Sequence, residues 1–135
     1  MNTQNSNFSP YIISITNVND SKGSLTSVSD ADIPYEIKRV FAITVTSPNL
    51  ERGGHAHKVC WQTIAPLQGK ILMFVSSNRE NSEFLIDKGE ALVVPPENWI
   101  LLKFEEVGDS AMVFASEYYD ELDYIFEKPI LDEFN

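Results

Sequence analysis

Apolar and polar residues alternate along most of the chain, in short runs separated by turn residues. Nine such runs cover residues 11–15, 25–28, 37–46, 55–65, 70–76, 83–86, 91–94, 100–105 and 111–116. The breaks between them are rich in Gly, Pro, Asn, Asp and Ser, which favour turns for distinct conformational reasons. Because side chains two apart on a strand share a face, the alternation indicates strands. Nine short strands at this spacing predict an all-β sandwich or barrel.

Two segments depart from simple alternation. Residues 37–46 carry apolar side chains on both faces, which indicates a strand covered on each side, and a second subunit is one candidate for the outer cover. Residues 119–127 place Tyr119, Leu122, Ile125 and Phe126 at near-helical spacing and are acidic. They predict one short C-terminal helix, which ends at the Lys128-Pro129 step because proline cannot continue it.

The length of 135 residues suits one domain. Residues 1–9 are polar, so we expect a frayed or disordered N-terminus followed by a single domain over residues 10–135. No apolar run reaches the ~20 residues that a membrane span requires, and no secretory signal is visible, so we expect no membrane association. Cys60 is the only cysteine, which excludes an internal disulfide and favours a cytoplasmic location.

The formal net charge of −10 argues against nucleic acid as a partner, since a basic face is missing. The basic residues are unevenly spread, however. Lys38, Arg39, Arg52 and Lys58 fall within residues 36–58, which hold only two acids, Glu36 and Glu51. A local cationic pocket can bind a small anion even in an acidic protein, because close pairs outweigh the screened distant charges. Ordinary surface positions remain the alternative for these four residues.

The chemistry centres on His55 and His57, which are the only two histidines and lie two apart. On a strand both imidazoles enter the same space, and histidine exchanges protons near neutral pH. Two histidines that merely satisfy hydrogen bonds in the core are the alternative. Cys60 falls on the opposite face of an uninterrupted strand and is expected to be a buried apolar residue. Gly53-Gly54 leads into a strand and not a helix, so it is interpreted as a turn and not as a phosphate-binding loop.

The spacing of this region resembles that of metal-binding cupins, whose motifs are Gly-x5-His-x-His-x4-Glu-x6-Gly and Gly-x5-Pro-x-Gly-x2-His. Here Gln62 occupies the position of the glutamate, and Ile100 that of the last histidine. The spacing predicts a cupin, that is, a double-stranded β-helix. Two histidines and a neutral amide fall short of the three protein ligands usual in catalytic metal sites, so no metal or other cofactor is expected. A metal-dependent activity with this incomplete ligand set remains a less favoured alternative.

A metal-free histidine pair beside cations suits proton transfer next to a carbonyl group. One imidazole removes the proton, and cationic or hydrogen-bonding neighbours stabilise the enediolate oxygen that forms.

Four strings of the sequence resemble one enzyme family. They are Ile-Pro-Tyr-Glu-Ile-Lys-Arg-Val at 33–40, Arg-Gly-Gly-His-Ala-His-Lys at 52–58, Pro-Pro-x2-Trp at 95–99 and Ala-Ser-Glu-Tyr-Tyr-Asp at 115–120. Taken together they resemble the nucleotide-sugar 3,4-ketoisomerases that act on dTDP-4-keto-6-deoxyglucose. The resemblance implies an RmlC-like jelly roll, no metal, and a homodimer with exchanged strands. It also implies a role in making deoxyamino sugars of surface polysaccharides.

The resemblance implies roles for five residues. His55 and His57 match the acid/base pair that moves a proton between sugar carbons 3 and 4, with His55 assigned as the principal base. Arg52 matches a cation that contacts the substrate, and a guanidinium can hold a phosphate in two-pronged fashion. Lys58 and Gln62 are weaker candidates for binding the dTDP-sugar or for orienting the histidines.

The sequence departs from the family pattern at Ala42, where a tyrosine is common, and at Ile100, where His or Arg often follows the tryptophan. Lost hydrogen bonds at these positions would change which sugar is accepted. Two alternatives therefore stay open: a catalytically lapsed protein that binds nucleotide sugars, and a related cupin sugar epimerase.

Overall fold

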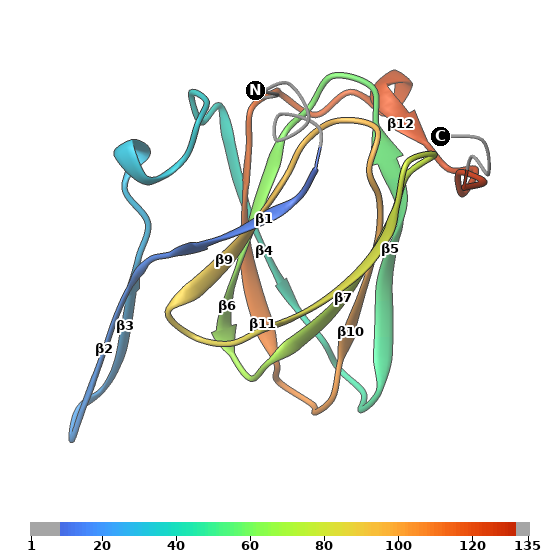
Figure 1. The fold of residues 1–135 in the computed structure, drawn as a ribbon. Coiled ribbons are helices and arrows are strands. Elements are labelled where there is room, and N and C mark those ends of the chain that lie inside the picture. The colour runs from blue at the N-terminus through green and yellow to red at the C-terminus, as the bar shows by residue number, and fades with distance from the viewer. Residues whose placement is uncertain (1–8, 132–135) are drawn as a thin grey trace.

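The computed structural model describes residues 9–131 and consists almost entirely of β-structure. Two five-stranded antiparallel sheets face each other, and a separate two-stranded hairpin extends away from them (Figure 1). The first sheet has the order β1-β9-β6-β11-β4, and the second has the order β12-β5-β10-β7-β8. This jelly roll confirms the predicted fold class. Of the N-terminal segment expected to be frayed, residues 1–8 lie outside the described residues.

The strands are bounded as follows: β1 Tyr11–Ser14, β2 Thr16–Asp20, β3 Gly23–Ser27, β4 Arg39–Thr44, β5 Leu50–His57, β6 Gln62–Gln68, β7 Ile71–Ser76, β8 Asn81–Ile86, β9 Glu90–Val94, β10 Trp99–Phe104, β11 Ser110–Ala115 and β12 Tyr124–Ile125. Two single-turn 3-10 helices complete the order, η1 at Asp30–Asp32 and η2 at Glu121–Asp123. No helix in the described part of the chain is long and apolar enough to cross a membrane.

The core fills the space between the two sheets. Along β10 and β11 the burial alternates strictly, so every second side chain points inward. Phe104, Ile71 and Ile86 are fully buried at one end of this space. Each fully buried large apolar side chain stabilises the fold by about 1.5–3 kcal/mol relative to its exposed state. The core therefore fixes the two sheets relative to each other, and the sheets form a rigid support for the residues at the other end of the barrel.

The hairpin of β2 and β3 stands apart from the two sheets (Figure 1). Val18 and Leu25 face each other across it and are 53% and 58% exposed. A two-stranded hairpin is marginally stable on its own in water. The exposed apolar pair is therefore a surface that packing against another molecule would stabilise.

Two expected elements need correction. The predicted strand 55–65 is two strands, because the chain turns between His57 and Gln62. The predicted helix 119–127 is wrong: this segment has only η2, followed by β12, which pairs with β5. Backbone pairing of Tyr124 with His57 satisfies polar groups that a helix would satisfy internally, so tertiary contact overrides the helical spacing.

Candidate active site

A cavity of about 220 Å³ opens between the two sheets at the end opposite Phe104. Its walls come from β4, β5, β6, β10, β11 and β12, and its lining is mostly apolar with a few polar groups. The lining residues are Phe41, Ala42, Ile43, Arg52, Gly53, His55, Gln62, Ile64, Ile100, Leu102, Val113 and Tyr124. An apolar pocket with a few convergent polar groups is the usual form of a binding site for a small molecule.

A β-bulge in β5 sets which residues face this cavity. Opposite β10, Arg52 pairs with Leu102 and His55 pairs with Ile100, so Gly54 has no partner in the register. Gly53 and Gly54 have φ of 97° and 79°, which favour glycine, and these residues are therefore a bulge and not the expected turn. Without the extra residue, side chains three apart would lie on opposite faces. The bulge places Arg52 and His55 on the same inner face.

The two imidazoles meet as expected for residues two apart on a strand. The ring centroids of His55 and His57 lie 5.1 Å apart, with the ring planes nearly perpendicular. His55 is half-buried and lines the cavity, whereas His57 is only 5% exposed. His55 thus stands at the wall of the cavity, and His57 lies against it outside the lining residues.

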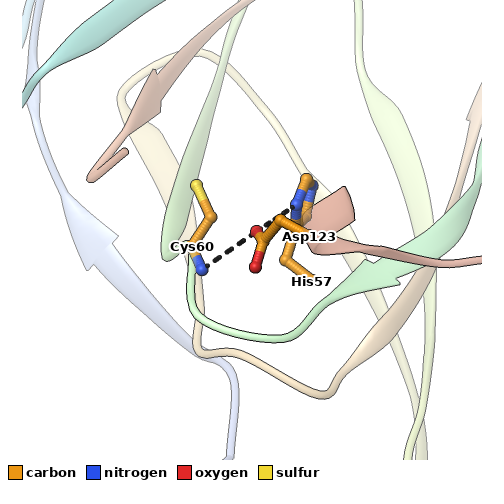
Figure 2. Close-up of side chains that lie close together, drawn as sticks. All are labelled: His57, Cys60 and Asp123. Atoms are coloured by element: carbon orange, nitrogen blue, oxygen red, sulfur yellow. Dashed lines mark hydrogen bonds and ion pairs between the residues drawn. The ribbon is translucent and has the colours of Figure 1, made fainter. Parts of the chain in front are cut away.

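An aspartate that the sequence analysis did not select orients His57. Asp123 in η2 lies beside the ring, with Oδ2 3.0 Å from Nδ1 (Figure 2). The same carboxylate accepts hydrogen bonds from the backbone N–H groups of Val59 and Cys60, which fix its position. An ionised carboxylate accepts only, so the neutral imidazole carries its hydrogen on Nδ1. The buried Nε2 is then a free acceptor, and it has no hydrogen-bond partner among the described residues.

Burial keeps both histidines neutral. It lowers the pKa of His55 below the ordinary value of 6.5, and the neighbouring His57 lowers it further. Burial also lowers the pKa of His57, and this outweighs the opposing hydrogen bond and charge of Asp123, while the positive charge of Arg39 adds to the lowering. Both rings are therefore able to accept a proton at neutral pH.

Arg39 belongs to the local cationic group found in the sequence but was not among the predicted site residues. It is the first residue of β4 and stacks on Phe41 and Tyr119, with its guanidinium carbon 4.8 Å and 5.5 Å from the ring centroids. Its Nε is buried and has no hydrogen-bond partner in residues 9–131. A buried donor without a partner is costly, so it is available to a bound anion or oxyanion.

The C-terminal segment covers the histidine pair. The ring of Tyr124 lies 4.7 Å from that of His55 and 4.5 Å from that of His57, measured between centroids. Phe126 stacks on Tyr124, and Trp99 donates a hydrogen bond from Nε1 to the carbonyl of Phe126. These contacts anchor an aromatic cover over the site, in place of the helix expected from the spacing.

Of the remaining predicted site residues, two line the cavity and one does not. Arg52 is exposed and Gln62 is 6% exposed, and both line the cavity. Lys58 is exposed in the turn after β5, outside the cavity lining, and its backbone N–H donates to the carbonyl of Asp123. Cys60 is buried as expected, but the strand ends at His57, so the thiol lies near that ring and not on the opposite strand face.

The chain is similar in sequence to known proteins. The family model "FdtA: WxcM-like, C-terminal" matches residues 8–134. The chain belongs to this family. It is 34% identical over 116 residues, 84% of each chain, to the TDP-4-oxo-6-deoxy-alpha-D-glucose-3,4-oxoisomerase of Aneurinibacillus thermoaerophilus. The family match confirms the resemblance found in the sequence.

Solved structures agree with this assignment. A histidine-to-asparagine mutant of the 3,4-ketoisomerase QdtA from Thermoanaerobacterium thermosaccharolyticum, in complex with TDP-4-keto-6-deoxyglucose, matches with a TM-score of 0.77 and 32% identity over 87% of each chain. The rmlC epimerase of Mycobacterium tuberculosis matches with a TM-score of 0.70 over 85% of this chain and 66% of its own, at 16% identity. The second match supports the RmlC-like fold alone.

The two departures from the pattern of the FdtA family have different structural weight. The side chain of Ala42 shares the outer, exposed face of β4 with Val40, so only its backbone side borders the cavity. A tyrosine side chain at this position would point away from the interior of the barrel. Alanine at position 42 therefore does not remove a hydroxyl from the cavity, contrary to the expectation from the sequence. Ile100 is 3% exposed, lines the cavity and pairs with His55. This position is where an apolar residue changes the polarity next to the histidine pair.

Gly53→Ala tests whether the bulge needs glycine. An added Cβ at Gly53 would lie 2.8 Å from the carbonyl oxygen of Ile100, whereas one at Gly108, with a similar φ of 88°, meets nothing within 4 Å. We expect Gly108→Ala to lower the free energy of unfolding by about 1–2 kcal/mol from backbone conformation alone. Gly53→Ala should lower it further, because backbone must move. Urea unfolding measures both, and equal losses would show that the close approach is unimportant.

The two histidines also predict how stability depends on pH. Their pKa values are lowered in the folded protein, so between pH 6.5 and those lower values the unfolded chain binds more protons than the folded one. The stabilising contribution of the two neutral histidines to the free energy of unfolding is therefore fully present above pH 6.5. It is lost as the pH falls below 6.5. We expect both imidazole resonances to titrate below pH 6.5 in NMR, with unfolding free energy falling over the same range. Titration of both rings at or above 6.5 would contradict this.

Proposed function

We propose that this protein is a nucleotide-sugar 3,4-ketoisomerase that acts on dTDP-4-keto-6-deoxyglucose or a close analogue without a metal. The observation that carries the proposal is the pair of adjacent imidazoles, of which His55 lines the cavity and His57 is hydrogen-bonded to Asp123. Membership of the FdtA family and the named substrates of its relatives give the sugar class. The pair has the form that proton transfer beside a carbonyl group requires.

In the proposed reaction His55 acts as the base for the carbon-bound protons. It removes the proton from C3 of the 4-keto sugar, and the electron pair of the C–H bond forms a C3–C4 double bond while the carbonyl oxygen at C4 becomes an enediolate oxygen. His55 then returns the proton to C4. His57 accepts the proton of the C3 hydroxyl at Nε2 and passes it to the C4 oxygen, which leaves a 3-keto sugar. The two transfers conserve all protons and need no redox cofactor.

The surroundings suit this chemistry. Asp123 stabilises the imidazolium that forms on His57, and Arg39 supplies a positive charge nearby for the enediolate oxygen. The rings of Tyr124 and Phe126 shield the histidines, so electrostatic interactions act at a lower dielectric than in water. The site thus provides both proton acceptors and charge stabilisation at one end of the barrel.

The size of the cavity limits which part of the nucleotide sugar can bind inside it. At about 220 Å³ it is smaller than the ~300–1,000 Å³ of pockets that bury a whole drug-sized ligand. It therefore holds the sugar ring, and the diphosphate and base lie outside. Arg52 at the rim is placed to contact the diphosphate, and Gln62 inside the cavity is placed to hydrogen-bond a sugar hydroxyl. Lys58 contacts only parts of the substrate beyond the cavity.

Ile100 favours a second candidate function. A sugar hydroxyl next to this side chain would have no hydrogen bond, so the physiological sugar is either an analogue that lacks a polar group there or a ligand that is bound and not converted. The second reading is a nucleotide-sugar-binding cupin without catalysis. Turnover in deuterated water separates the two readings, because only proton transfer carries deuterium into the sugar ring.

His55→Asn tests the proton-transfer role. Incubated with the dTDP-keto sugar in deuterated water, the unaltered protein should form the 3-keto isomer with deuterium in its ring. We expect the substitution to reduce turnover by ~10²–10⁴-fold, since general acid–base groups commonly contribute that much. Its affinity for dTDP, measured by calorimetry, should stay nearly unchanged. A loss of only a few-fold would show that His55 is not the base.

Arg52→Ala is the matched contrast on the same strand. It should weaken dTDP binding and leave deuterium incorporation intact at saturating substrate. Unaltered affinity for dTDP would remove Arg52 from the binding site.

The protein is further proposed to form a homodimer with exchanged strands and to serve the synthesis of deoxyamino sugars of surface polysaccharides. The projecting hairpin supports the dimer, because its exposed Val18 and Leu25 need an apolar partner. A second copy supplies one when each hairpin packs on the other barrel.

The double variant Val18→Ser, Leu25→Ser tests the dimer. We expect it to weaken dimerisation at least tenfold in sedimentation equilibrium, because two apolar side chains would be lost from each half of the interface. Val107→Ser is the control, since Val107 is 64% exposed in a turn of the barrel. Equal dimerisation of both variants, or a monomeric unaltered protein, would contradict the proposed interface.

A further inference from the structure

A second cluster of possible ligand atoms lies on the Nδ1 side of His57. The Nδ1 of His57, the Sγ of Cys60 and a carboxylate oxygen of Asp123 all lie within 4.8 Å of one another. Figure 2 shows the three side chains gathered at the turn that follows β5. His57 and Cys60 are 5% and 4% exposed. This cluster differs from the ligand set of metal cupins, which faces the cavity from the positions of His55, His57, Gln62 and Ile100.

The local backbone holds the three groups in place. His57 and Cys60 are separated by two residues, a spacing common between zinc ligands on one turn. Asp123 is held over the same turn, because its carboxylate accepts from the N–H groups of Val59 and Cys60. Its carbonyl also accepts from the N–H of Lys58. These backbone hydrogen bonds hold Asp123, whereas Nδ1 of His57 bonds to its carboxylate and Sγ of Cys60 donates to the carbonyl of Trp61.

We propose that this trio binds a borderline divalent cation such as Zn²⁺, and that the bound cation inhibits the isomerase. Imidazole, thiolate and carboxylate together suit Zn²⁺ or Co²⁺ better than Mg²⁺ or Ca²⁺, which prefer oxygen ligands alone. The charges balance, because one thiolate and one carboxylate neutralise a divalent cation at a buried site. Ligand distances of about 2.0–2.3 Å require the three atoms to approach by roughly 1 Å, and the fourth position takes water.

Binding changes the protonation of His57. The cation takes the lone pair of Nδ1, the ring hydrogen is carried on Nε2, and the thiol proton of Cys60 passes to solvent. Nε2 is then an N–H donor and no longer accepts a proton from the sugar. The inhibition rests on the proposed function of His57, whereas the binding of the cation does not.

Titration of the purified protein with Co²⁺ tests the site directly. Cys60 is the only cysteine in the chain, so a thiolate-to-cobalt charge-transfer band reports this residue alone. We expect the band in the unaltered protein and in His55→Asn, and its loss in Cys60→Ser and Cys60→Ala, with circular dichroism confirming that each variant is folded. No band in the unaltered protein overturns the proposal. Co²⁺ binding that is lost in His55→Asn and kept in Cys60→Ser also overturns it, because the metal would then sit in the cavity between the histidines.

Zn²⁺ inhibition of turnover is the second measurement. The Zn²⁺ concentration that halves activity should rise at least tenfold in Cys60→Ser relative to the unaltered protein, and equal inhibition of the two would place the inhibitory metal elsewhere. A protein without isomerase activity would leave the cobalt band intact, so failure of the proposed function and failure of this site give different results.

Discussion

The extra residue in β5 is the constraint on which the site depends. A regular strand would place Arg52 and His55 on opposite faces, and the bulge at Gly53-Gly54 brings both to the inner face while β10 keeps its own register. Beyond the bulge the strand runs on to His57 and pairs with β12 on its other edge. One local irregularity therefore directs Arg52 and His55 toward the same cavity, and the closely approaching backbone of Ile100 leaves room only for glycine at position 53.

A second dependence runs from the loop after β5 to the chemistry of His57. The turn between β5 and β6 offers two backbone N–H groups, and these hold the carboxylate of Asp123 at the ring. The carboxylate in turn decides which nitrogen carries the hydrogen. Burial works against the charge of Asp123, so the ring is neutral at rest but has a partner when it becomes an imidazolium. That combination suits a group that must both accept and release a proton.

Sequence patterns predicted the fold and the histidine pair because both follow from local periodicity. Alternation located the strands, and the two-residue spacing of His55 and His57 placed their rings together. The parts that were missed depend on contacts between distant segments. Asp123 is 66 residues from His57, and the spacing around it resembles a helix. The pairing of β12 with β5, next to Asp123, is a tertiary effect that no window of sequence contains. Likewise, the sequence Gly53-Gly54 is compatible with either a turn or a bulge. Only the register with the neighbouring strand β10 distinguishes the two.

The position of Ile100 connects stability, protonation and selectivity. It faces His55 directly across the ladder, so it helps to desolvate that ring and to keep it neutral. A cation at this position would repel a protonated His55 and could bind a sugar hydroxyl or phosphate. An isoleucine provides neither interaction. Under the proposed function, selectivity for the sugar falls to the other polar groups near the cavity, which include the buried amide of Gln62 and the buried guanidinium nitrogen of Arg39. The isoleucine thus leaves both histidines in place and reduces the number of polar groups at the cavity that the proposed substrate can contact.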